Sequence, residues 1–418
     1  MGSDGAMVSF EQARHLVEEH ASRLCPQGSE RLSLVESAGR VLAEPVVADR
    51  NFPPFPRATR DGYAVRAADL SPLPATLAVV GEIKAGAGVT LHVGSGQAAA
   101  IMTGAPAPPG ADSVVMVEYA SRQGDRVEIR RGVAVGENIV TQGAEAKLGE
   151  RLLSPGVRLD APAIALASSV GKTHPLVYAK PRVAVLATGD EVVDVDVPPA
   201  PYEIRNSNSY SLAAQIQAAG GKPLLLPIAP DEPARLRELI ADGLEADLLL
   251  LSGGVSAGRY DFVEQVLGEL KAEFFFTGAQ IQPGRPVVFG RLPRRAEDTS
   301  PDRGSGCRYF FGLPGNPVST MVTFELFVRP MVEALAGMTP ARLVFLHARL
   351  KSEVKTKTGL RRFLPAVLSG EFAQGEVELL PWHGSGDMAA TARANCYVVI
   401  TPEQERIRAG EWVPVLLR

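Results

Sequence analysis

Cysteine is scarce in this sequence: Cys25, Cys307 and Cys396 are the only three in a chain of 418 residues. Three widely separated cysteines cannot build a disulfide framework, and their spacing does not suit a cysteine-ligated zinc site. We therefore expect the protein in a reducing compartment, the cytoplasm.

The sequence also lacks long apolar runs and a strong excess of charge. No apolar stretch approaches the roughly 20 residues that cross a bilayer, and residues 1–7 lack the features of a secretory signal. The 43 lysines and arginines against 47 aspartates and glutamates give a net charge of −4. Nucleic-acid binding needs clustered positive charge, so we expect no nucleic acid as partner, although a local basic pocket is allowed. Because long apolar runs are missing, we expect no membrane as partner either.

Motifs for several kinds of chemistry are missing as well. The six histidines do not stand at metal-ligand spacing, which disfavours a zinc or iron enzyme. The glycine-rich loops described below contain neither G-x-G-x-x-G nor the Walker lysine pattern. Dinucleotide and ordinary nucleoside-triphosphate binding are therefore not indicated.

The middle third of the chain alternates buried strands with amphipathic helices. Apolar runs at residues 182–187, 224–226, 247–251 and 308–313 have the length and composition of buried strands. Helical spacing of apolar residues follows in segments near 207–219, 231–244 and 318–335. Strand, loop and helix repeated in this way predict an α/β domain, with a mainly parallel sheet covered by helices on both faces.

Other parts of the chain follow different patterns. Residues 10–24 form an amphipathic helical stretch, and short apolar runs separated by glycine and proline between residues 77 and 129 predict a small all-β module. We expect this module to be an insertion in a larger scaffold. Alternation of apolar and polar side chains at residues 346–351 predicts a half-buried strand in a C-terminal β-barrel or sandwich.

Three loops that follow predicted strands are rich in glycine, proline and hydroxyl residues: 188–191, 252–258 and 312–317. In an open α/β sheet, ligands bind beyond the carboxyl ends of the strands, where glycines allow close approach and helix N-termini attract anions. Each loop alone fits a simple tight turn, but three at one sheet edge favour an anion pocket. The substrate-binding residues that we predict are Gly189, Ser252, Gly253, Gly254, Ser256, Arg285, Pro314, Gly315, Asn316 and Ser319.

Four acidic residues, Asp190, Glu191, Asp231 and Asp261, lie at or beside the same loops. Carboxylates gathered at an anion site suit Mg²⁺, which takes one or two of them together with water and substrate phosphate. We therefore predict a Mg²⁺ cofactor with ligands among these four. Two simpler interpretations stay open: Asp231 as a helix cap, and Glu191 as a solvated side chain.

Four segments, in this order along the chain, resemble the motifs of one known family. They are D-G-Y-A-V from Asp61, T-G-A-P from Thr103, S-G-G-V-S-A-G from Ser252 with Asp261 after it, and G-L-P-G-N-P-V-S from Gly312. The chain thereby resembles the molybdopterin molybdenumtransferase family, which includes the E domain of gephyrin. The likeness covers nearly the whole sequence.

The resemblance implies an elongated subunit with a linking domain, an inserted β domain, a molybdopterin-binding α/β domain and a C-terminal β-barrel. It also implies a homodimer whose active site lies between the α/β domain of one subunit and the inserted domain of the other. The division that we predict is an N-terminal helix in 1–26, a linking domain in 27–50 and 146–178, the inserted β domain in 51–145, the α/β domain in 179–338 and the barrel in 339–418.

The resemblance also implies a reaction, in which adenylylated molybdopterin and molybdate, with Mg²⁺, yield molybdenum cofactor and AMP. Matched by position, the residues that it implies to be functional are Asp61, Thr103, Glu191, Asp231 and Asp261. We predict catalytic roles for Asp61, Thr103, Asp231 and Asp261, and a metal site formed by Asp190, Glu191, Asp231 and Asp261.

The sequence departs from the family pattern at several positions. Arg60 stands where methionine is usual, Glu145 stands in for an aspartate, and Gln282 and Arg285 stand where lysines are common. Arginine still binds an oxyanion, whereas Gln282 supplies no charge. Two alternative functions remain: a molybdopterin adenylyltransferase, which would consume ATP, and a non-catalytic pterin-binding scaffold.

Overall fold

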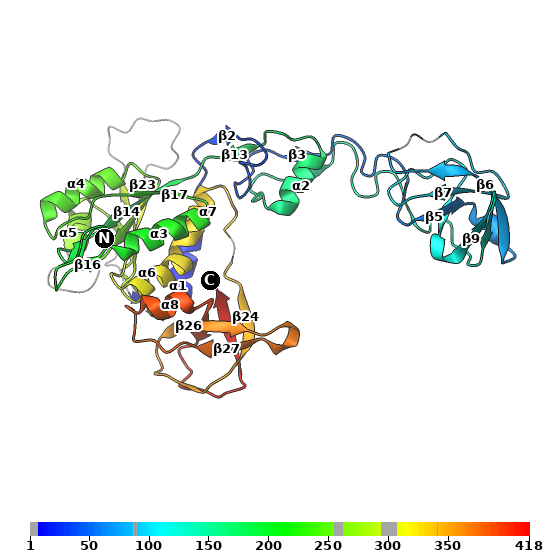
Figure 1. Ribbon diagram of the computed structural model, residues 1–418. Coiled ribbons are helices and arrows are strands. Elements are labelled where there is room, and N and C mark those ends of the chain that lie inside the picture. The colour runs from blue at the N-terminus through cyan, green and yellow to red at the C-terminus, as the bar shows by residue number, and fades with distance from the viewer. Residues whose placement is uncertain (1–6, 87, 89, 255–261, 294–306, 341) are drawn as a thin grey trace.

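The computed structural model describes residues 7–86, 88, 90–254, 262–293, 307–340 and 342–418 as an elongated molecule with separate lobes (Figure 1). An α/β lobe and a β-barrel lie together at one end, a small linking lobe lies in the middle, and a β lobe lies at the other end. Within the described ranges no helix has both the length and the apolar character needed to cross a bilayer.

The α/β lobe contains a six-stranded sheet. In spatial order its strands are β17 (Lys222–Leu225), β14 (Arg182–Ala187), β18 (Leu248–Ser252), β23 (Cys307–Leu313), β22 (Val288–Pro293) and β19 (Glu273–Phe276). The first four run parallel, and β22 is antiparallel to both of its neighbours. Every residue of β18 is buried, as a central strand with helices on both faces requires. The predicted mainly parallel sheet is confirmed.

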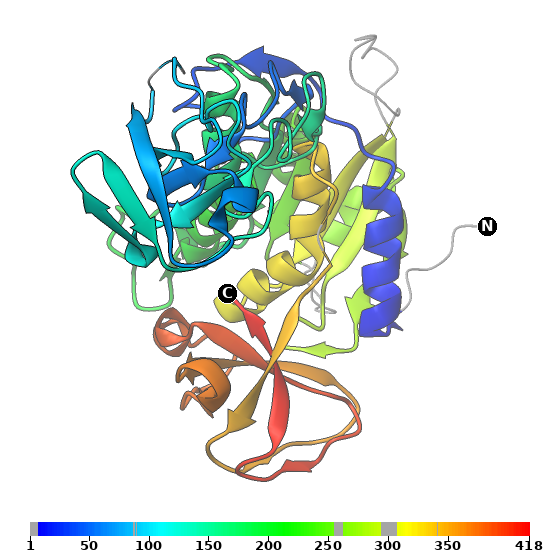
Figure 2. The same cartoon turned by 90° about the vertical axis from the view of Figure 1, so that its right-hand side faces the viewer.

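Helices cover both faces of this sheet. The helices are α1 (Phe10–Ala21), α3 (Ser207–Ala218), α6 (Pro317–Thr323) and α7 (Arg329–Leu335) on one face, and α4 (Pro233–Gly243) and α5 (Phe262–Glu269) on the other. The predicted helix over residues 318–335 contains a π-helical turn, η3 (Phe324–Val328), between α6 and α7. Figure 2 shows α1 lying alongside the α/β lobe, and its buried residues belong to the core of that lobe.

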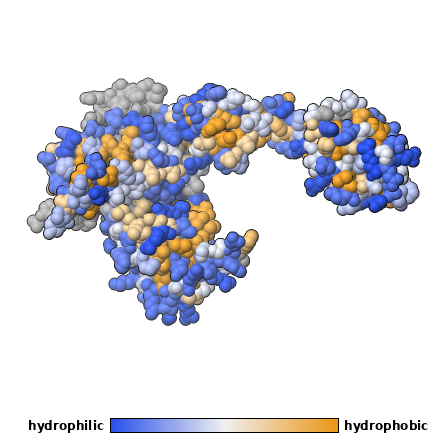
Figure 3. Space-filling model, in the orientation of Figure 1, coloured by the Kyte–Doolittle hydropathy of each residue, from blue (hydrophilic) through white to orange (hydrophobic). Residues whose placement is uncertain are grey.

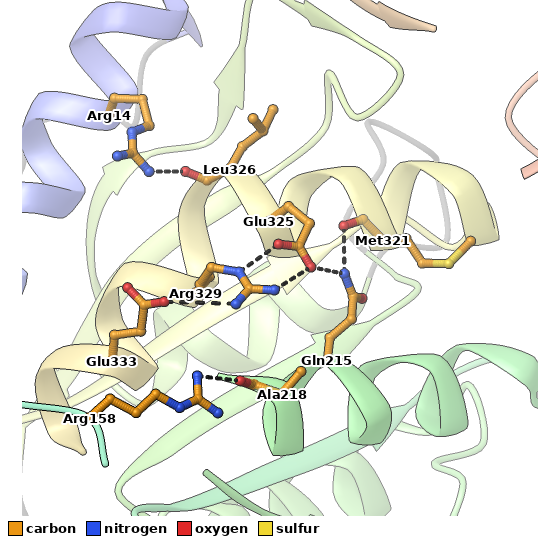
Figure 4. Close-up of polar contacts among 9 residues, drawn as sticks. All are labelled: Arg14, Arg158, Gln215, Ala218, Met321, Glu325, Leu326, Arg329 and Glu333. Atoms are coloured by element: carbon orange, nitrogen blue, oxygen red, sulfur yellow. Dashed lines mark hydrogen bonds and ion pairs between the residues drawn. The ribbon is translucent and has the colours of Figure 1, made fainter. Parts of the chain in front are cut away.

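Polar contacts pin α1 and α3 to the π-helical turn (Figure 4). The Arg14 guanidinium donates to the carbonyl of Leu326 at 2.5 Å. From α3, Gln215 Nε2 donates to the Met321 carbonyl at 3.0 Å and to Glu325 Oε1 at 2.7 Å. A π-helical turn breaks the regular helical ladder, so the Arg14 donor that reaches its Leu326 carbonyl stabilises it. These contacts fix α3, whose opposite end faces the site described below.

The linking lobe is small, and two passes of the chain build it. It contains β2 (Ser29–Arg31) paired with β13 (Leu176–Tyr178), β3 (Val46–Val47) paired with β12 (Arg151–Leu153), and α2 (Ala161–Ser169). Where the two passes leave toward the β lobe they are bonded to each other, because Phe52 N–H donates to the Ala146 carbonyl at 2.8 Å.

The β lobe has its own six-stranded sheet, in line with the predicted all-β module. Its strands in spatial order are β8 (Ser113–Met116), β5 (Gly62–Val65), β7 (Gln97–Ile101), β6 (Ala75–Ile83), β10 (Arg126–Ile129) and β9 (Ala120–Gln123). Adjacent residues such as Val114 and Val115 belong to two different apolar clusters, because successive side chains point to opposite faces of the sheet. A short pair, β4 (Arg57–Ala58) and β11 (Ile139–Val140), adjoins it.

The C-terminal lobe is a closed barrel. Its five strands are β26 (Arg361–Ser369), β27 (Glu376–Leu379), β24 (Phe345–Leu350), β30 (Trp412–Leu417) and β28 (Cys396–Ile400), and β28 pairs back with β26. This closure decides between the barrel and the sandwich. The α/β lobe holds the barrel in place, because β21 (Ile281–Gln282) adds to β26 and the Val318 N–H donates to the Ser385 carbonyl at 3.0 Å.

Candidate functional site

A cavity of about 410 Å³ lies at the carboxyl ends of β14, β18 and β23, where an open α/β sheet binds its ligands. Seven of the predicted substrate-binding residues line it: Gly189, Ser252, Gly253, Gly254, Pro314, Gly315 and Asn316. The three loops that the sequence singled out therefore meet at one cavity.

Glycine is required in the loop after β18. Gly253 has a φ of +94° and Gly254 a φ of +64°, which L side chains adopt with strain. A Cβ on Gly253 would lie 2.8 Å from the Thr188 carbonyl oxygen, and one on Gly254 would lie 2.6 Å from Val263 Cγ2. The backbone of β18 thus reaches the loop after β14 at a distance that only glycine allows.

Three of the four predicted metal ligands gather at this edge. Glu191 and Asp231 line the cavity, and Asp190 lies beside Asp231, because Asp190 Oδ1 accepts the Asp231 N–H at 3.0 Å. Glu191 folds back over Gly189, where an added Cβ would lie 2.5 Å from Glu191 Oε2. Glu191 therefore lines the cavity with an exposed side chain, so it is both solvated and placed at the cavity.

Asp231 does not cap a helix. Helix α4 begins at Pro233, its N-cap is Glu232, and no side chain makes a capping hydrogen bond there. Desolvation raises the pKa of Asp231, and the negative charges of Asp190 and Glu191 raise it further. The interpretation of Asp231 as a cap is wrong, and the carboxylate lies in a locally negative environment at the cavity.

The carboxylates that the structure describes at this edge do not form a complete metal site by themselves. In the part of the chain that the structure describes, no three His, Cys, Asp or Glu side chains converge as a ready-made metal site. Mg²⁺ commonly takes only one or two carboxylates and completes its shell with water and substrate phosphate. Glu191 and Asp231 provide such a pair on the cavity wall.

A second cavity of about 400 Å³ lies where the α/β lobe meets the barrel. Arg285 and Ser319, both predicted to bind substrate, line it together with Trp382 and Ser385 from the barrel. It adjoins the first cavity, since both are lined by the same three residues, Pro286, Pro314 and Asn316.

Arg285 is the one cationic side chain among the described residues that line this second cavity. Its side chain is exposed, and Gly284, with a φ of +102°, makes the turn before it. Ser319 is 4% exposed at the start of α6. A guanidinium and hydroxyl groups around one cavity can bind an oxyanion.

Asp61 and Thr103 lie in the β lobe, remote from both cavities within one chain. The space-filling view shows open space between the β lobe and the α/β lobe with its barrel (Figure 3). Asp61 Oδ1 accepts the Thr103 N–H at 2.6 Å, and this hydrogen bond lowers the pKa of Asp61. The exposed pair therefore presents an ionised carboxylate on the surface of the β lobe.

Two predicted site residues, Asp261 and Ser256, lie outside the described residues. Two others that line the first cavity, Arg205 and Asn208, were not predicted from the sequence. Asn208 stands at the start of α3, where asparagine is read as a helix-start residue. The polar run of residues 206–209, which covers the N-cap and first turn of α3, was the signal that would have found it.

Comparison with known proteins places the chain in a family. Residues 8–171 match the family described as MoeA N-terminal region (domain I and II), residues 184–334 a probable molybdopterin binding domain, and residues 347–417 the MoeA C-terminal region (domain IV). A Nostoc sp. protein named molybdopterin molybdenumtransferase is 35% identical over 93% of this chain and 89% of its own length. Its namesake from Haemophilus influenzae is 32% identical over 98% of both chains.

Solved structures agree with the sequence comparison. The crystal structure of the molybdopterin biosynthesis moeA protein from Pyrococcus horikoshii OT3 has a TM-score of 0.75 and 29% identity, and covers 99% of this chain and 100% of that one. Sequence similarity over nearly the full length, the four-lobed fold and the loop motifs at the cavity all agree: the chain belongs to the molybdopterin molybdenumtransferase family.

Proposed function

We propose that this enzyme inserts molybdate into adenylylated molybdopterin and releases AMP, as a step in molybdenum cofactor biosynthesis. The observation that carries the proposal is the pair of adjoining cavities, one with carboxylates and glycine loops and the other with an arginine and hydroxyl groups. A ligand with a phosphate linkage and a separate oxyanion needs two such neighbouring environments.

In this proposal the first cavity binds the phosphate-linked part of the substrate. The glycines at residues 253 and 254 let the backbone approach the ligand closely, and Arg205 supplies a positive charge at the rim. The start of α3 faces the same cavity, because Asn206, Ser207 and Asn208 line it. The positive end of this helix dipole favours a bound anion.

Glu191 and Asp231 would hold Mg²⁺, and Asp190 and Asp261 remain predicted ligands. When bound, the ion offsets negative charge on the phosphate oxygens of the substrate. The chain's own contribution is to place the Glu191 and Asp231 carboxylates on the cavity wall and to keep Asp190 beside them through the hydrogen bond to the Asp231 N–H.

The second cavity would bind molybdate. Arg285 provides the charge, and the Ser319 and Ser385 hydroxyls provide further donors. Because Pro314 and Asn316 border both cavities, an oxyanion held here lies next to the part of the substrate in the first cavity. Proximity of the two bound reactants lowers the entropic part of the barrier.

The active form would be a homodimer. The Asp61–Thr103 pair is remote from both cavities of its own chain, so it would act at the cavity of a second copy. A two-fold dimer would form two such composite sites.

The proposal is tested by measuring AMP release from adenylylated molybdopterin with and without molybdate. We expect AMP to form with both substrate and molybdate present and Mg²⁺ in the buffer, without ATP. ATP consumption to make the adenylylated compound would instead show an adenylyltransferase. Binding of the pterin with no AMP release under any condition would show a scaffold.

A further inference from the structure

Asn208, in the first turn of α3, bridges two of the loops that form the first cavity. Its Nδ2 donates to Ser252 Oγ at 2.9 Å, at the end of β18, and to the Gly315 carbonyl at 2.7 Å, in the loop after β23. One amide nitrogen on the helix thereby holds together two strand ends, and Asn208, Ser252 and Gly315 all line the cavity.

The hydrogen bond to the Gly315 carbonyl fixes the orientation of the Asn208 amide. The Gly315 carbonyl can only accept, so the atom of Asn208 that faces it must be the NH₂ group. Oδ1 therefore points the other way, and it is buried with no hydrogen-bond partner among the described residues. An unpaired buried acceptor costs stability. The useful part of the Asn208 side chain is therefore its NH₂ group, which donates both hydrogen bonds.

The fixed amide in turn fixes the Ser252 hydroxyl. Because Asn208 Nδ2 donates to Ser252 Oγ, the hydroxyl proton of Ser252 cannot point back at the amide. Ser252 is 3% exposed, and within the described part of the chain no protein acceptor receives its proton. The Ser252 O–H is thus left as a donor at the cavity wall.

We propose that Asn208 is a positioning residue that directs the Ser252 hydroxyl toward a phosphate oxygen of the bound substrate. It acts on the ligand through Ser252, while its hydrogen bond to the Gly315 carbonyl holds the amide in this orientation. This inference rests on the proposed function, since it assumes that the ligand of the first cavity bears phosphate.

The test is a double-mutant cycle on the equilibrium binding of adenylylated molybdopterin. Asn208→Ala and Ser252→Ala are each expected to raise the Kd about 10-fold, the size typical of losing a hydrogen bond to a charged group. The double variant is expected to bind about as weakly as Ser252→Ala alone, because Asn208 acts on the ligand through Ser252. Losses that multiply to about 100-fold would overturn the inference.

Gln215→Ala is the matched control for loss of stability. Gln215 is an amide on the same helix whose Nε2 also donates to a backbone carbonyl, that of Met321, and whose Oε1 is also buried without a partner (Figure 4). It does not line the cavity. We expect it to lower the melting temperature about as much as Asn208→Ala while leaving the Kd unchanged.

Two outcomes separate this inference from the function on which it rests. If the unsubstituted enzyme does not bind adenylylated molybdopterin, both the function and the inference fail. If it binds and releases AMP but Asn208→Ala binds equally well, the function stands and the role of Asn208 is refuted. An equal rise in Kd for Gln215→Ala and Asn208→Ala would also refute it, because the effect would then be general to the helix.

Discussion

Asp231→Asn is expected to lower molybdate-dependent AMP release about 100-fold or more, roughly 2.7 kcal/mol of barrier, while slightly raising the stability of the ligand-free protein. The substitution keeps the size of the side chain and removes its charge. Activity falls because the carboxylate on the cavity wall is lost, although the backbone N–H that donates to Asp190 remains.

The expected rise in stability of Asp231→Asn follows from the raised pKa of Asp231. The folded-state pKa of Asp231 is raised, by desolvation first and then by Asp190 and Glu191, so the ionised form is less favourable in the folded protein than in the unfolded chain. Above the raised pKa the ionised group therefore opposes folding, and asparagine removes that cost. The gap between the two proteins should close as the pH falls toward the unfolded-state pKa of about 3.9, because Asp231 is then neutral.

Two measurements check this prediction: AMP release at neutral pH, and the melting temperature of both proteins from neutral to acidic pH. Asp242→Asn, an exposed carboxylate near the other end of α4, is the activity control and should stay within about two-fold of the unsubstituted enzyme. An activity loss below about three-fold for Asp231→Asn would remove Asp231 from the site.

Gly253→Ala is the second substitution with a large expected effect. At a φ of +94° an alanine is strained, and its Cβ would lie 2.8 Å from the Thr188 carbonyl oxygen, which belongs to the backbone and cannot move aside alone. We expect a stability loss of about 1–3 kcal/mol and an activity loss of about 100-fold, because the loops after β14 and β18 must separate.

Denaturant unfolding and AMP release measure the two effects of Gly253→Ala. Gly268→Ala is the matched control: it lies inside α5, and an added Cβ there would meet no atom within 4 Å. It should raise stability by about 0.5–1 kcal/mol, since alanine is the better helix former, and leave turnover unchanged. Normal activity of Gly253→Ala would mean that the close approach of the two loops is unnecessary.

The sequence predicts the α/β lobe well where burial dominates. The run at residues 182–187 is observed as β14 with the same bounds, because a strand covered on both faces is apolar along its whole length. The run at residues 247–251 is observed, shifted by one residue, as the fully buried β18. Where apolar residues alternate, as at the C-terminus, the pattern shows a strand but not its partner, so barrel closure by β26 and β28 had to come from the structure.

The candidate site is predicted less completely, for physical reasons. Loop motifs identify the glycines, since their backbone angles and close approaches leave no other residue suitable. Composition does not distinguish an aspartate that caps α4 from one that lines a cavity, and Asp231 was resolved only by its contacts. Asn208 was missed because its bridging contacts join segments far apart in the sequence.

In the proposed homodimer two chains build each active site together, and mixed dimers test this directly. Asp61→Asn and Asp231→Asn chains are each expected to be nearly inactive alone. When the two variant chains are mixed in equal amounts and allowed to exchange, half of the dimers would contain one chain of each kind. Each mixed dimer would have one site with neither substitution. We predict that the mixture regains about one quarter of the unsubstituted AMP release. No regain, in a mixture shown to contain mixed dimers, would contradict the shared site.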